Sequence, residues 1–375
     1  MGCHLSKEED VVIHRRKSQE FQVGATKPRR KSLSQKLLAG RNSEPTNGRR
    51  DVFSIFGEHG MVLERQSAHE CSPHSMSESV FSTATTASDN ERANIRGPLD
   101  QYMPALNISY GAFSDKGMRK TNEDRQICTS QTIQGDTVAY FGVYDGHGGS
   151  RVSEYLSSNL HLSVYERMRR TNDMERSVVE AFAATDDVIF KKQMESGSTA
   201  VSVVVRGKQA VIASIGDSQA VLSCDGKAKN ICVPHTPDLS SEHERILAAK
   251  GTVVKGRIFG LLGVSRAFGD NDFKTSRGEF KDKFNGDLVS SKPDVVHHTI
   301  SSQDEFIVLG SDGLFDVMEP QQVVNFVRTK IELHGEVQHA SEELVSHAIS
   351  LGSMDNVSAV IICFNQPTTA NSESE

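Results

Sequence analysis

The chain has 375 residues, and 42 Lys and Arg against 49 Asp and Glu give it a formal net charge of −7. The charge is unevenly distributed, because the first 50 residues carry 12 basic and 5 acidic side chains whereas the remaining 325 carry 30 and 44. An acidic body without interleaved aromatic residues argues against a nucleic-acid-binding protein. No apolar stretch reaches the roughly 20 residues that a membrane-spanning helix needs.

Residues 1–104 are rich in Ser, Arg, Lys, Glu and Asn and poor in apolar clusters, which predicts a disordered basic arm. The six cysteines of the chain form no Cys-x-x-Cys pair, and no secretory signal is recognisable. We therefore expect free thiols and a cytoplasmic protein.

The amino-terminal hexapeptide Met1-Gly2-Cys3-His4-Leu5-Ser6 matches the N-myristoylation pattern, with Gly2 as the acceptor. A single myristoyl chain holds a membrane weakly, so a second signal is needed. Cys3 is a candidate palmitoylation site, and short basic runs follow it along the arm. We expect the arm to associate with an anionic membrane surface. A solvated basic tail or a nuclear-localisation signal is the alternative.

The predicted secondary structure begins near residue 105. Runs of β-branched and aromatic residues bounded by Gly and Asp turns predict short strands, several of them in antiparallel hairpins. Apolar residues at helical spacing predict helices. The predicted strands cover residues 137–144, 199–205, 209–215, 219–223, 306–310 and 357–364. The predicted helices cover residues 150–168, 174–195, 240–250, 321–333 and 341–351.

Hairpin strands mixed with pairs of helices do not fit a strictly alternating parallel sheet. They predict an α+β fold, in which two mainly antiparallel sheets form a central β-sandwich flanked by helix pairs. We assign this domain to residues 105–366 and a disordered tail to residues 367–375.

Five short acidic segments stand next to these predicted strands and turns. A strand end crowded with carboxylates needs a cation to neutralise it, and carboxylates with water suit Mg²⁺ or Mn²⁺. The pattern therefore predicts a hydrolytic site with two divalent ions. For Asp217 and Asp316 taken singly, a turn or capping role is an equal alternative. The segments are Arg119-Lys-Thr-Asn-Glu123-Asp124, Asp145-Gly-His147-Gly-Gly149, Gly216-Asp217-Ser218, Ser311-Asp312-Gly313 and Asp355-Asn356.

The same segments belong to a longer ordered set, which adds Ser198-Thr199-Ala, Ser265-Arg266-Ala-Phe-Gly-Asp270, Lys292-Pro293 and Asp316 to the motifs above. Over roughly residues 105–366 the set resembles the protein phosphatase 2C family of metal-dependent serine/threonine phosphatases. The resemblance implies the same sandwich fold, phosphoserine and phosphothreonine proteins as substrates, and Mg²⁺ or Mn²⁺ as cofactor, two ions per site with a weaker third. We also expect a monomer.

By this resemblance Asp145 would bridge the two ions. Asp312 and Asp355 would hold one of them, and Glu123 with the Gly146 carbonyl would hold the other. Asp124 would orient water from behind the ligands, and Asp217 and Asp316 match positions linked to the third ion. A hydroxide bridging the metals would attack phosphorus directly.

Two further residues would act on the phosphate by this resemblance. The planar guanidinium of Arg119 would grip the phosphoryl oxygens, and His147 is the candidate general acid for the leaving oxygen. The other thirteen histidines show no metal-ligand spacing.

The main competing function is a pseudophosphatase that uses the same fold as a scaffold. It predicts the loss of a metal-holding acid, whereas Glu123, Asp145, Asp312 and Asp355 are all present. Residues 271–291 would form a flap beside the site. Its basic side chains would either favour acidic substrates or belong to a solvated loop, and they are Lys274, Arg277, Lys281 and Lys283.

Overall fold

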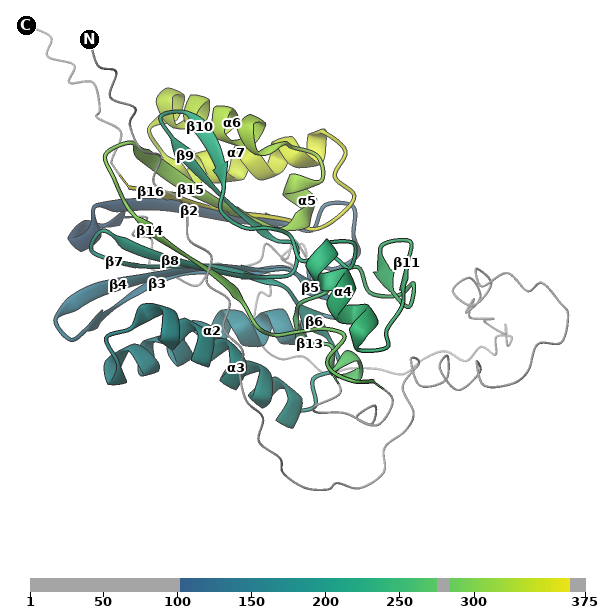
Figure 1. The fold of residues 1–375 in the computed structure, drawn as a ribbon. Coiled ribbons are helices and arrows are strands. Elements are labelled where there is room, and N and C mark those ends of the chain that lie inside the picture. The colour runs from purple at the N-terminus through teal and green to yellow at the C-terminus, as the bar shows by residue number, and fades with distance from the viewer. Residues whose placement is uncertain (1–101, 275–283, 365–375) are drawn as a thin grey trace, which may run out of the picture. The chain divides into compact units, whose positions relative to one another are not determined.

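Two antiparallel sheets lie face to face in the computed structural model, which describes residues 102–274 and 284–364 (Figure 1). The five-stranded sheet has the order β14-β8-β7-β4-β3 and the six-stranded sheet the order β1-β2-β16-β15-β9-β10. The strands of the first are β3 (Arg125–Ile133), β4 (Asp136–Tyr144), β7 (Ala200–Arg206), β8 (Gln209–Ile215) and β14 (Asp294–Thr299). Those of the second are β1 (Tyr102–Met103), β2 (Ile108–Asp115), β9 (Gln219–Cys224), β10 (Lys227–Asn230), β15 (Asp304–Gly310) and β16 (Val357–Cys363).

Alternation along β4 explains why this sheet is covered on both faces. Ala139, Phe141 and Val143 point to the core between the two sheets, where they join side chains of β15 and β16. Val138 and Tyr140 point the other way, into a second core under helices. Successive strand residues face opposite sides, so a continuous apolar run is what a strand buried on both faces requires.

Each sheet carries a pair of helices on its outer face (Figure 1). α2 (Arg151–Arg170) and α3 (Met174–Lys191) cover the five-stranded sheet, and α6 (Pro320–His334) and α7 (Val337–Ser350) cover the six-stranded one. α6 begins with a capping box in which Glu319 and Gln322 each bond the other's backbone, and it ends at Gly335 in the left-handed conformation. These signals fix both ends of α6.

Short elements gather at one end of the sandwich (Figure 1). There β5 (Gly146–His147), β6 (Gly197–Ser198) and β13 (Phe268–Gly269) form a small sheet of their own. The other short elements of the described residues are α4 (Ser240–Ala248), β11 (Val253–Val254), β12 (Arg257–Ile258), η3 (Asn271–Phe273) and α5 (Asp312–Phe315). A short 3-10 helix, η2 (Pro104–Leu106), separately connects β1 to β2.

The predicted α+β sandwich flanked by helix pairs is confirmed. The predicted helix over residues 174–195 is too long, because α3 ends at Lys191 and Gln193 has a φ of +56°. Strands β2, β3 and β14 were not predicted. β3 and β14 are edge strands, and β3 carries polar residues such as Thr129 and Gln131, so neither has the apolar run of a central strand.

Most of the predicted arm, with its acylation sites Gly2 and Cys3, lies outside the described residues, as does the tail. The last residues of the arm, 102–104, are described. They are not disordered, because β1 pairs with β2. Among the described residues, no helix combines the length and the apolar character needed to cross a bilayer.

Candidate metal centre

The predicted ligands meet in one cavity of about 520 Å³ at the end of the sandwich. They arrive from separate elements: Asp145 follows β4, Asp312 is the first residue of α5 after β15, and Asp355 precedes β16. Glu123 lies in the loop before β3. The predicted site residues that line the cavity are Arg119, Glu123, Asp145, Gly146, His147, Asp217, Asp312 and Asp355.

Three of these carboxylates are packed against one another. One oxygen each of Asp145, Asp217 and Asp312 lies within 4.8 Å of the others. Burial raises the pKa of Asp145 well above its ordinary value, and the charges of Asp124 and Asp312 add to the rise. Burial and the charge of Asp312 raise the pKa of Asp217 to about 7. Such a cluster is stable in its charged form only with a cation between the oxygens.

An orphaned atom supports the same conclusion. The Oδ1 atom of Asp312 is buried and has no hydrogen-bond partner within residues 102–274 and 284–364. Buried polar atoms in folded proteins almost always have one, unless an ion or water supplies it. The donor set is made of oxygens, which is the set that Mg²⁺ and Mn²⁺ prefer. The residues therefore fit a hard divalent ion.

Glu123 and Gly146 lie next to each other and line the same cavity as the three packed carboxylates. A Cβ on Gly146 would come within 2.4 Å of the Glu123 carbonyl oxygen, so only glycine allows this approach. The Gly149 amide donates a 2.8 Å hydrogen bond to Glu123 Oε2. Asn356 fixes the loop by accepting from the Glu123 amide at 2.8 Å and donating to the Lys116 and Thr121 carbonyls.

Asp124 is buried behind the ligands and does not line the cavity. Its Oδ2 atom accepts a 2.8 Å hydrogen bond from the Ser358 hydroxyl on β16. Burial raises its pKa to about 7, although hydrogen bonds from Ser358 and Ser311 oppose the rise. The support of the ligands by Asp124 stays a prediction, and the structure places its side chain outside the cavity lining.

Asp217 and Asp316 have different surroundings. Asp217 belongs to the packed carboxylates, whereas Asp316 ends α5 and does not line the cavity. Burial and the charge of Asp355 raise the pKa of Asp316. The structure thus brings Asp217 into the cluster and leaves Asp316 beside it.

Arg119 lies at the rim of the cavity with its side chain 58% exposed. Its Nη2 atom is 2.5 Å from Asp355 Oδ2, and its Nε atom donates to the Met354 carbonyl oxygen at 3.3 Å. These contacts hold a guanidinium at the mouth of an acidic cavity, where it can contact an incoming anion.

His147 is paired with Asp270, a residue of the predicted Ser265–Asp270 motif to which the sequence gave no role. The distance from His147 Nε2 to Asp270 Oδ2 is 2.7 Å. Burial lowers the pKa of His147, but the charge and hydrogen bond of Asp270 outweigh it and raise the pKa above 6.5. The pairing could not be found from the motif alone, because the two residues are 123 positions apart.

The flap prediction is wrong for one residue. Lys274 is only 1% exposed, and its ammonium contacts both oxygens of Asp186 on α3 and the Ala267 carbonyl. It therefore cannot face a substrate. Arg277, Lys281 and Lys283 lie outside the described residues. Arg257 of β12 and Lys120 also line the cavity, and sequence reasoning did not single them out.

Comparison with known proteins points to one family. The family model described as "Protein phosphatase 2C" matches residues 108–357. Probable protein phosphatase 2C 54 of Oryza sativa subsp. japonica is 34% identical over 268 residues, which are 69% of this chain and 73% of that protein. Probable protein phosphatase 2C 69 of Arabidopsis thaliana is 34% identical over 272 residues, 71% of this chain and 72% of that protein.

Solved structures share the fold. A sex-determining protein of C. elegans matches with a TM-score of 0.61 at 25% identity, covering 70% of this chain and 66% of that one. A phosphatase from a pathogenic strain of Toxoplasma gondii matches with a TM-score of 0.60 at 22% identity, covering 70% of this chain and 94% of that one.

Proposed function

The chain belongs to the protein phosphatase 2C family, and on this premise we propose that it hydrolyses phosphoserine and phosphothreonine in proteins with divalent ions bound in the acidic cavity. The observation that carries the proposal is the convergence of Asp145, Asp217 and Asp312, with one buried oxygen of Asp312 left without a partner. A protein phosphatase of this kind needs a site that holds cations against a phosphate.

The proposed ligand sets are those that the family resemblance implies, and most of their residues line the cavity. Asp145 would contact both ions. Asp312 and Asp355 would complete one set, and Glu123 with the Gly146 carbonyl would complete the other. Asp217 and Asp316 would hold a third, weaker ion. When bound, Mg²⁺ or Mn²⁺ neutralises phosphate charge and lowers the pKa of water enough to supply a nucleophile at neutral pH.

The remaining steps are performed by side chains of the chain itself. Arg119 would bind the phosphoryl oxygens, since its guanidinium lines the cavity beside Asp355. His147 would give a proton to the serine or threonine oxygen as it leaves. Asp270 would hold the Nε2 atom of His147, which leaves Nδ1 as the donating atom.

The test is hydrolysis of p-nitrophenyl phosphate and of phosphoserine and phosphothreonine peptides with Mg²⁺ or Mn²⁺. We expect turnover with either metal, none after EDTA treatment, and a loss of about 100-fold or more in Asp145→Asn. Asp225→Asn, in a turn that the structure places between β9 and β10, is the control. Turnover without any metal would overturn the mechanism, and a folded protein without turnover in either metal would favour the scaffold.

We also propose that the amino-terminal arm attaches this cytoplasmic phosphatase to an anionic membrane. The support is the sequence: Gly2 fits the myristoylation pattern, Cys3 offers a second acyl site, and basic runs follow. A nuclear-localisation signal is the alternative reading of the basic runs. The proposal treats the protein as a monomer without a nucleic-acid partner.

A further inference from the structure

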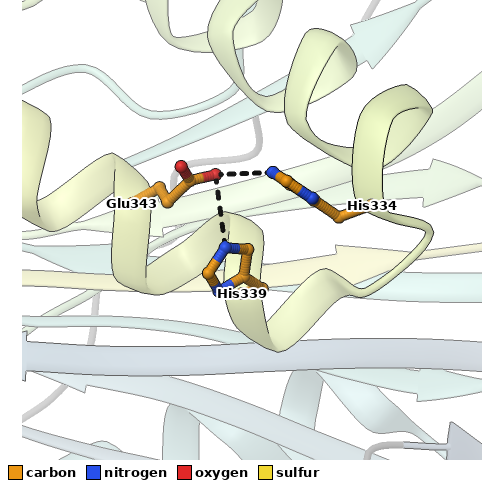
Figure 2. A group of neighbouring side chains, drawn as sticks. All are labelled: His334, His339 and Glu343. Carbon is orange, nitrogen blue, oxygen red and sulfur yellow. Dashed lines mark ion pairs between the residues drawn. The ribbon is translucent and has the colours of Figure 1, made fainter.

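A second group of metal-ligating side chains lies at the turn between α6 and α7, away from the acidic cavity. Figure 2 shows His334 at the end of α6 facing His339 and Glu343 on α7. One ligand atom of each residue lies within 4.8 Å of the other two. We propose that these three residues bind a transition-metal ion, Zn²⁺ in the first place, in a site separate from the catalytic one.

The distances around Glu343 suit such an ion. Its Oε2 atom is 3.4 Å from His334 Nε2 and 3.9 Å from His339 Nε2 (Figure 2). In a tetrahedral zinc site with bonds of about 2.0 to 2.1 Å, neighbouring ligand atoms lie roughly 3.3 Å apart. Both histidine nitrogens therefore lie within about 0.6 Å of the required distance from Glu343 Oε2, and all three ligand atoms lie within 4.8 Å of one another.

The shared oxygen also lacks any other partner. The Glu343 side chain is 29% exposed, but its Oε2 atom is buried and accepts no hydrogen bond from the described residues, where its contacts are the two ion pairs with imidazole nitrogens. A buried carboxylate oxygen without a donor is uncommon in folded proteins and indicates a missing ion or water. This observation is independent of the clustering of the three residues and points to the same position.

Neighbouring contacts hold the ligands in place. Lys330 Nζ contacts the other carboxylate oxygen, Oε1, at 3.0 Å, which orients Glu343 and leaves Oε2 toward the histidines. His339 Nδ1 lies 4.0 Å from Glu342 Oε2, which is longer than the hydrogen bond that usually orients a zinc-binding histidine. Gln338 fastens the first turn of α7 to β2 through two hydrogen bonds with the Ala112 backbone.

The donor set decides which metal would bind. Two imidazoles and one carboxylate favour Zn²⁺ and its neighbours among the transition metals, whereas the oxygens of the cavity favour Mg²⁺ and Mn²⁺. The His334 and His339 side chains are 33% and 44% exposed, which leaves room for water as a fourth ligand. A bound ion would tie the end of α6 to the first turns of α7.

Sequence reasoning missed this group because only one pair has a recognisable spacing. His339 and Glu343 are four residues apart on one helix face. His334 belongs to the preceding helix and reaches them only because Gly335, with a φ of +69°, turns the chain back.

The test is Zn²⁺ binding to the full-length protein, measured by competition with a chromogenic chelator while excess Mg²⁺ fills the acidic cavity. We expect the His334→Ala/His339→Ala double variant and Glu343→Gln each to bind zinc at this site roughly 100-fold more weakly or worse. His297→Ala is the matched control, because His297 forms a surface pair with Glu175 at 2.9 Å and belongs to no three-ligand group in the described part of the chain. Circular dichroism without metal checks that all variants fold.

A Co²⁺ titration supplies a second readout. Nitrogen ligands in a four-coordinate site give strong visible absorption, so we expect bands in the wild type and in His297→Ala that are absent from Glu343→Gln. The histidines in residues 1–101 stay in every variant and cannot produce a difference between them. Equal zinc affinity and equal Co²⁺ spectra in the wild type and the double variant would overturn the proposal.

Discussion

The Nε2 atom of His147 lies 2.7 Å from Asp270 Oδ2, and the space for this pair exists because residue 197 is glycine. A Cβ at Gly197 would come within 2.2 Å of His147 Nε2 and 2.4 Å of Asp270 Oδ2. The small β5-β6-β13 sheet thus brings the proposed general acid and its partner together.

Replacing Asp270 with Asn should lower kcat about 10-fold and leave KM nearly unchanged. The neutral amide holds the imidazole less firmly and no longer stabilises its charged form, while the groups that bind phosphate are untouched. Steady-state kinetics on a phosphopeptide measures both constants.

Asp225→Asn is the matched control for this change. Asp225 has a φ of +49° and Asp270 one of +48°, so any effect of Asn on a left-handed backbone is common to both variants. The positioning role would be contradicted if the Asp270→Asn enzyme had the wild-type kcat, whether or not its KM was raised.

The metal-free protein should become less stable as the pH rises from about 4 to about 7. Burial raises the pKa of Asp124 and Asp217 from 3.8 to about 7, so the folded state binds more protons than the unfolded state across this window. The free energy of unfolding is therefore highest below the ordinary pKa of 3.8. It falls as the pH approaches the pKa of about 7 that these groups have in the folded protein. Thermal unfolding in EDTA at about pH 5 and about pH 7.5 measures the change.

Excess Mg²⁺ should remove most of this loss, because the ion replaces the protons between the carboxylates and binds only the folded state. Asp217→Asn should reduce the pH dependence in EDTA, since it removes one of the carboxyl groups whose pKa is raised in the folded state. A wild-type melting temperature in EDTA that rises between these pH values would show that the carboxylates do not repel one another as described.

Glu242→Gln should destabilise the protein by about 3 kcal/mol at neutral pH and by less as the pH falls. Glu242 is 2% exposed and contacts Arg266 and Arg245 at 2.7 and 2.8 Å. Burial raises its pKa, but the hydrogen bonds and charges of the two arginines outweigh burial and lower it to about 2. The stabilisation by the ionised Glu242 carboxylate is complete above pH 4.5, which is its ordinary pKa. It is lost as the pH falls through about 2, its pKa in the folded protein.

Urea unfolding at about pH 7 and about pH 3 measures this difference. Glu180→Gln breaks an exposed pair with Arg176 and should cost less than about 1 kcal/mol at either pH. Equal losses in the two glutamate variants would show that burial of Glu242 does not matter.

Lys274→Met should destabilise the protein by about 3 to 5 kcal/mol, because it removes the buried ammonium that contacts both oxygens of the buried Asp186 carboxylate. The Lys274→Met/Asp186→Leu double variant should recover part of the loss, since the carboxylate that the ammonium neutralises is removed together with it. Chemical denaturation of the wild type, the single variant and the double variant measures both losses of stability. A double variant as unstable as the single one would assign the loss to packing rather than charge.

Gly2→Ala should move the protein from membrane to soluble fractions of cells, because acylation at this position requires the free amine of glycine. Ser6→Ala removes the other motif residue and should weaken attachment less. Unchanged fractionation of Gly2→Ala would count against lipid anchoring and favour the basic runs acting as a localisation signal.

The sequence by itself determined most elements and the local position of the acids. Runs such as 137–144 and 209–215 are apolar over the length of a strand, and the acids follow or precede these runs. β8 begins and ends at the predicted residues, and Asp145 follows β4 as expected. Local periodicity is sufficient here because each element's buried face is set by residues a few positions apart.

Only the tertiary structure decided which distant side chains meet. Ser358 on β16, which pairs with β2, donates a hydrogen bond to Asp124. The absence of a side chain at Gly197 leaves space for the His147–Asp270 pair. Lys274 of the expected flap is buried against Asp186 on α3. The turn at Gly335 likewise brings His334 to Glu343. Such contacts depend on strand register and helix packing, and the first three join residues 88 to 234 positions apart, so no local pattern in the sequence encodes them.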